Sequence, residues 1–204
     1  KTLVNLTWAT NDFEQHSAAT VFQRVFTPQV PLDNLLLAIK VTRVDQWYYG
    51  SAFNPTFGLT PHQTIAHVET NSSYHGLGTM LDFPARYFQA GLEWAAERGT
   101  RGVFYGFPHR GNLLEEGMFY VIGRLAWDPR VSADELADRW ARRVFGQAAA
   151  PGMARLLARS GELLRSGWYL RAPSLRGWNP LPLVRVDNFL AAGRPPWDRG
   201  RSHE

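Results

Sequence analysis

Three charged residues stand where strand-like segments end, and their types suit carboxylate chemistry. Lys40 closes the apolar run 35–41, and Asp45 follows it within one short loop. Glu69 ends a second strand-like run, 64–69. A carboxylate in such a place acts as a general base or accepts hydrogen bonds from substrate hydroxyls. For Glu69 the structural alternative is a salt bridge to a neighbouring strand.

Burying an ammonium group is unfavourable unless an anion lies beside it. Lys40 is the only lysine away from the N-terminal residue. It therefore predicts either an anionic ligand or a structural ion pair with Asp45.

Two histidines and several aromatic residues accompany these charges. His67 shares a strand face with Glu69 because side chains alternate along a strand, and it is either a hydrogen-bonded core histidine or a substrate contact. These two residues and His75 match no known metal-ligand spacing, so we predict no metal site. Trp47 and Tyr48 follow Asp45 after a single intervening residue, Gln46. They suit sugar binding, because pyranose faces stack on aromatic rings; the alternative is packing within the loop.

The composition excludes several classes of protein. Of the 204 residues 45% are hydrophobic and 20% are charged, which is enough for a core and argues against disorder. The absence of cysteine excludes disulfides, a cysteine–zinc site and a thiol nucleophile. No glycine-rich phosphate loop, GxSxG or HExxH motif occurs. We therefore predict no cofactor, and we expect a cytoplasmic protein.

The charge balance bears on partners. The formal net charge is +4, but the arginines are dispersed and form no long basic run. Nucleic-acid binding is therefore disfavoured, although a small α/β protein that binds an anionic partner through its arginines stays an alternative. No apolar run is long enough to cross a membrane. An oligosaccharide is the expected partner, and a homodimer is left open.

Hydrophobic periodicity predicts alternating strands and helices. Strands are expected at 3–8, 35–41, 64–69 and 102–107. Helices are expected at 13–26, 81–98, 113–127, 132–146 and 151–166. Gly99 is predicted to close the second helix, and a capping box at 132–135 is predicted to begin the fourth, which ends at Gly146. This alternation indicates a parallel α/β fold. Four strands cannot close a barrel of eight. The chain is thus either a small open sheet or the C-terminal half of a (β/α)8 TIM barrel followed by additional helices. Polar residues at the strand ends favour the half barrel.

Several segments together resemble one enzyme family. They are LLLAIKVTRVDQ (35–46), NPTFG (54–58), YHG (74–76), GRLAWDP (123–129), SADELADRW (132–140) and FG (145–146). In order and spacing they resemble glycoside hydrolase family 67, the α-glucuronidases that remove (4-O-methyl)glucuronic acid from xylan-derived oligosaccharides. The resemblance runs from about residue 3 to about residue 146.

The resemblance assigns roles to particular positions. It places Lys40 where the family contacts the uronate and Asp45 where the family has a catalytic aspartate. Tyr74 and His75 join Trp47 and Tyr48 as substrate-facing residues. Such enzymes invert the anomeric centre: an acid protonates the leaving oxygen while a carboxylate base activates water.

Two departures from the family pattern affect the expected chemistry. The second base-side carboxylate of the family falls on Ser73, and Glu69 is the nearest carboxylate that could replace it. The family's general acid lies upstream of the matched segments. We therefore expect a half barrel that belongs to a longer parent chain. The competing hypothesis is a catalytically impaired carbohydrate-binding or scaffold relative of the same fold.

The predicted elements and the extent of the resemblance divide the chain into three regions. Residues 1–146 are predicted to form the partial catalytic barrel. Residues 147–193 are predicted to form a helical extension, and residues 194–204 a disordered or truncated tail.

Overall fold

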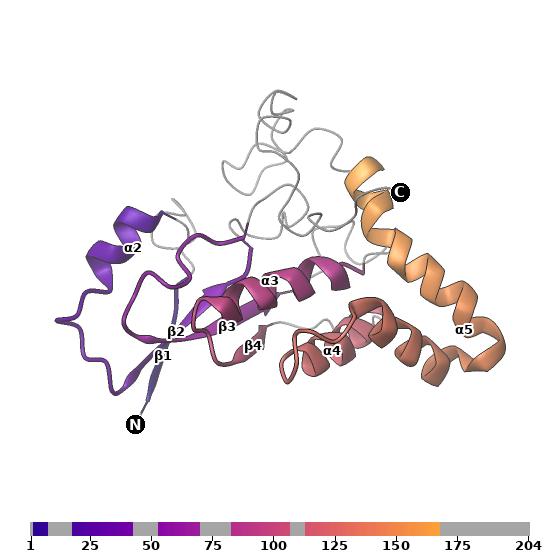
Figure 1. Ribbon diagram of the computed structural model, residues 1–204, viewed down its shortest axis with the longest axis horizontal. Helices are drawn as coiled ribbons and strands as arrows, with labels where there is room; N and C mark the ends of the chain where they lie inside the picture. The colour runs from indigo at the N-terminus through magenta and orange to yellow at the C-terminus, as the bar shows by residue number, and fades with distance from the viewer. Residues whose placement is uncertain (1, 8–17, 43–52, 70–82, 107–112, 168–204) are drawn as a thin grey trace.

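The computed structural model describes residues 2–7, 18–42, 53–69, 83–106 and 113–167, with side chains up to residue 160. Four strands form one sheet: β1 (Leu3–Leu6), β2 (Leu35–Lys40), β3 (Gln63–Glu69) and β4 (Val103–Gly106). They lie in the order β1-β2-β3-β4, and every neighbouring pair is parallel (Figure 1). All four strands were expected from the sequence, and their bounds differ by two residues at most.

The helices follow the predicted alternation. They are α2 (Ala19–Val25), α3 (Ala85–Glu97), α4 (Leu113–Leu125) and α5 (Ala133–Gly167). The fold is therefore mixed α/β with a parallel sheet, as the sequence predicted. The early part of the helix expected at 13–26 and the tail beyond 167 lie outside the described residues.

The two faces of the sheet differ in chemistry. Strand alternation and the parallel register place Leu37, Ile39, Val41, Ala66 and Val68 on one face. All five are almost fully buried, and they form the centre of the core. The opposite face carries the polar groups that end the two central strands. We call the first face the helix-covered face and the second the open face, although Ala38, Lys40 and His67 on the second face are also buried.

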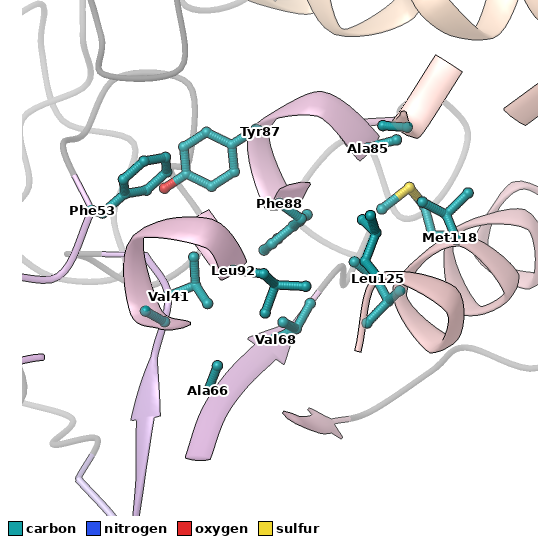
Figure 2. Packing of buried hydrophobic residues seen from close by; sticks show 14 of the residues in the cluster. Val41, Phe53, Ala66, Val68, Ala85, Tyr87, Phe88, Leu92, Met118 and Leu125 are labelled. Atoms are coloured by element: carbon teal, nitrogen blue, oxygen red, sulfur yellow. The ribbon is translucent and has the colours of Figure 1, made fainter. Parts of the chain in front are cut away.

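The long helix α3 packs across the helix-covered face. Its buried positions recur at helical spacing and include Phe88, Leu92 and Ala95. Figure 2 shows Leu92 between Phe88 of the same helix and Val68 of β3, and all three belong to the core cluster. Burying these apolar side chains supplies the main driving force for holding the sheet and helix together.

A glycine at the helix end sends the chain back to the sheet. Gly99 has a φ of +85°, its N–H donates to the carbonyl of Ala96, and the N–H of Thr100 donates to the carbonyl of Ala95. These two bonds form a Schellman motif, which satisfies carbonyls that the helix itself leaves unpaired. The prediction that Gly99 closes this helix is confirmed.

The last two helices pack on one another and on α3. Ser132 caps α5, because its Oγ accepts a hydrogen bond from the N–H of Glu135 at 3.4 Å. Gly146 interrupts α5 with a φ of 77°, so two helical segments meet there, as the sequence predicted. Within the described ranges, no helix combines the length and apolarity needed to span a bilayer.

Gly91 sets how closely α3 approaches the sheet. A Cβ at this position would overlap the Cγ1 of Val41 and lie 3.3 Å from Cε1 of Phe53. Val41 is fully buried and β-branched, so it has little freedom to move aside. We predict that Gly91→Ala lowers the free energy of unfolding by about 1–3 kcal/mol, measured by urea denaturation.

Gly123→Ala in α4 is the matched control. Nothing lies within 4 Å of a Cβ at position 123, so alanine there should stabilise the helix by up to ~1 kcal/mol. If both substitutions stabilised the protein, close packing at Gly91 would not limit the approach of α3.

Asp128 gives the fold one pH-dependent contact. Hydrogen bonds from the side chain and then the backbone N–H of Arg130 hold the pKa of Asp128 below its usual value of 3.8. A depressed pKa stabilises the fold above pH 3.8, and this contribution disappears as the pH falls through the lowered pKa.

The Asp128→Asn variant should therefore have a slightly lower melting temperature than the unsubstituted protein at pH 7. Thermal unfolding followed by circular dichroism should show the difference closing at lower pH; a constant difference would contradict this linkage.

Candidate functional site

A buried ion pair lies at the carboxyl end of the two central strands. Lys40 is the last residue of β2 and Glu69 the last of β3, and the Lys40 ammonium contacts the Glu69 carboxylate. Their side chains are 3% and 11% exposed. The carboxyl ends of parallel strands are where α/β folds collect ligand chemistry. The structure thus brings together two of the residues that the sequence singled out.

The sequence had left two interpretations of Glu69 open, a salt bridge and a general base, and the contact tests the first. The salt bridge to a neighbouring strand is confirmed. The partner is Lys40, for which the sequence had considered Asp45 instead. The base role for Glu69 is not tested by this contact, because a carboxylate has two oxygens and several acceptor sites.

His67 extends the polar group across the open face. It is the register partner of Lys40 on β2 and of Phe104 on β4, and it is only 3% exposed. Its ring lies 5.0 Å from the ring of Phe104, between centroids. The predicted sharing of a face with Glu69 agrees with this register, while Ala66 and Val68 lie on the helix-covered face.

Gly106 makes the position of His67 possible. A Cβ at Gly106 would lie 2.6 Å from Nε2 of His67, closer than real Cβ atoms come to a neighbour. Gly106 is also the register partner of Glu69. The sequence reading did not single out this glycine. The sequence signal that could have found it is a glycine in the strand segment 102–107, which follows a strand segment that carries a histidine.

The chain after β2 returns to the same edge of the sheet. Thr42 and Phe53 form an antiparallel bridge, and the N–H of Asn54 donates to the carbonyl of Val41 at 3.0 Å. The Oδ1 of Asn54 in turn accepts hydrogen bonds from the N–H and Oγ1 of Thr56. Thr42 and Phe53 therefore both lie at the carboxyl end of β2.

Most of the other predicted site residues lie outside the described residues. These are Asp45, Trp47, Tyr48, Tyr74 and His75, together with Ser73 at the expected carboxylate position. Their placement in one site with Glu69 stays a prediction. Among the residues that the structure describes, no group of three or more histidine or acidic side chains is arranged to hold a metal.

The arrangement has a definite chemical capacity. Lys40 brings an ammonium group with three donors to this end of the sheet, and Glu69 brings a carboxylate with several acceptor sites. Because the pair is largely removed from water, its charges are screened less than surface charges. The open face therefore offers a fixed cation and a fixed carboxylate side by side.

The chain matches no protein-family model and no curated protein sequence. The function must accordingly be argued from the residues themselves.

Lys40 and Glu69 should prove energetically coupled. Removing one member of a buried pair takes a compensating charge away from the other, so Lys40→Met or Glu69→Gln should each lower the free energy of unfolding by up to about 3–5 kcal/mol. The double variant should be destabilised by clearly less than the sum of the two. Urea denaturation of all four proteins measures this coupling, and strict additivity would show that the contact contributes little.

Proposed function

We propose that this chain forms the carboxyl-terminal half of a (β/α)8 barrel in a glycoside hydrolase of the α-glucuronidase type. Its substrates would be xylan-derived oligosaccharides that carry a uronic acid. In this proposal Lys40 binds the uronate carboxylate, Asp45 is the base that activates water, and Glu69 is the second carboxylate. The general acid would come from another part of a longer protein.

The single observation that carries the proposal is the buried ammonium group of Lys40 at the carboxyl end of a parallel sheet. The lysine is 2% exposed, yet it ends a strand that is otherwise apolar. Keeping a cation there is unfavourable unless anions compensate for it. Glu69 supplies one such anion. A uronate carboxylate arriving at the same end of the sheet would supply another.

The edges of the sheet support the half barrel. Val4 and Leu6 on β1 and Phe104 on β4 lie on the open face and are 49%, 43% and 38% exposed. Leu3 on the other face of β1 is 65% exposed. Apolar side chains at both edges are unfavourable in water and mark surfaces that need a covering element. Additional parallel strands on either side would bury them and leave the polar strand ends at one mouth.

A catalytically impaired sugar-binding relative is the second candidate. It is favoured by Ser73 at the expected carboxylate position and by the contact that holds Glu69 against Lys40. A carboxylate committed to a lysine is less available to orient a water molecule. Under this alternative the site would bind uronate-bearing sugars without hydrolysing them.

Lys40 should discriminate between charged and neutral sugars. We predict that Lys40→Met weakens binding of a glucuronic acid-substituted xylo-oligosaccharide by at least about tenfold, as expected when a charge-assisted contact is lost. Binding of the unsubstituted xylo-oligosaccharide should change little. Isothermal titration calorimetry on folded protein measures both, and an equal loss for the two sugars would reject the uronate role.

Glu69→Gln separates the enzyme from the binding relative. In an enzyme this variant should bind the substituted oligosaccharide while its release of glucuronic acid falls. Arg143→Gln, on the exposed surface of α5, is the control that removes a charge elsewhere. The activity is measured in the longer protein that supplies the general acid. If that protein binds the sugar but releases no glucuronic acid, the binding relative is supported.

A further inference from the structure

Helix α4 has one buried face and one face turned away from the core. Helices α3 and α5 pack against α4 (Figure 1). The buried positions are Glu115, Gly117, Met118, Val121, Ile122 and Leu125. The opposite face, with the turn that follows the helix, is exposed or partly exposed. We call it the outer face of α4, and its residues are Leu113, Glu116, Phe119, Tyr120, Gly123, Arg124, Ala126 and Trp127.

Most of this outer face is apolar. Leu113 is 42% exposed, Phe119 is 57% exposed and Trp127 is 90% exposed. Exposed apolar side chains scattered singly are normal, whereas a group of them on one surface marks an interaction site. Only two charged residues interrupt the group, Glu116 and Arg124. The outer face therefore has the composition of a protein interface.

The two charged residues are available to a partner. In the ranges that the structure describes, neither Glu116 nor Arg124 forms an ion pair. The guanidinium carbon of Arg124 lies 5.6 Å from the ring centre of Tyr120, one helical turn earlier. This cation–π contact keeps the arginine side chain along the outer face.

The residues of the outer face are arranged symmetrically about Tyr120. Glu116 lies four positions before Tyr120 and Arg124 four positions after it, and Leu113 and Trp127 lie seven positions before and after it. Intervals of four and seven residues keep side chains on one side of a helix. A second α4 that runs antiparallel across Tyr120 therefore brings each glutamate to an arginine and each leucine to a tryptophan. Such self-complementarity is what a twofold interface requires.

We propose that a second copy of this chain covers the outer face, so that two α4 helices pair antiparallel about a twofold axis beside Tyr120. Glu116 and Arg124 then form two symmetric ion pairs, and the exposed aromatic rings are removed from water. The paired segment 113–127 is only about 20 Å long, so the interface is small and the dimer is reversible. The proposal does not depend on a glycosidase activity.

Charge reversal tests this arrangement. Sedimentation velocity on the unsubstituted protein, at concentrations up to about 100 µM, should show a monomer that becomes a dimer. Glu116→Arg and Arg124→Glu each place like charges opposite one another at two symmetric positions. Each variant alone should therefore dimerise at least about tenfold more weakly. An equimolar mixture of the two variants should recover the dimer, because a chain with two arginines then faces a chain with two glutamates.

The mixture also separates association from folding. Both reversals oppose the dipole of α4, because Glu116 lies in its first turn and Arg124 in its last. Mixing changes neither chain, so recovery cannot come from a more stable helix. Arg143→Glu, on the exposed surface of α5, is the control and should leave the dimer unchanged. Circular dichroism confirms that all variants are folded.

Three results would overturn the proposal. The first is a monomer at every concentration, which would leave the outer face to a different polypeptide. The second is a dimer that withstands both reversals, which would place the contact on another surface. The third is a mixture that stays monomeric, which would exclude the antiparallel pairing.

Discussion

The close contact between α3 and the helix-covered face is the constraint on which the other features depend. Gly91 lets the helix backbone approach Val41, and Phe88 and Leu92 then reach the middle of the sheet. Because this packing secures one face, the open face can carry charged groups without unfolding the domain. The Schellman turn at Gly99 returns the chain from the helix to the start of β4. One helix thus fixes both the core and the strand that completes the sheet.

The two ends of the sheet then have different chemistry for a geometric reason. In a parallel sheet all carboxyl ends lie on one side and all amino ends on the other. Lys40 and Glu69 meet at the first end because their strands are neighbours in register. His62 and Arg101 line one cavity at the second end, because each lies just before a strand.

Much of the fold could be predicted from the sequence. The runs at 35–41 and 64–69 were predicted as strands from their length and residue types, and Gly99, Ser132 and Gly146 marked helix ends through their turn and cap chemistry. These signals are local, since they depend on residues a few positions apart. The site was less predictable. Lys40 and Glu69 were each recognised as needing a partner, but their partnership depends on a register between strands that are 23 residues apart in the chain.

The sequence by itself determined which residues carry charge, which runs are buried and which turns end the helices, because composition and periodicity encode these properties locally. It also determined that Lys40 needs an anion, since an ammonium group in an apolar strand must be compensated. Only the tertiary structure decided that Glu69 is one such anion and that Gly106 leaves room for His67. It alone revealed the cavity beside His62 and Arg101. Those features arise where distant segments meet, and the distance between two side chains is set by packing rather than by their spacing in the chain.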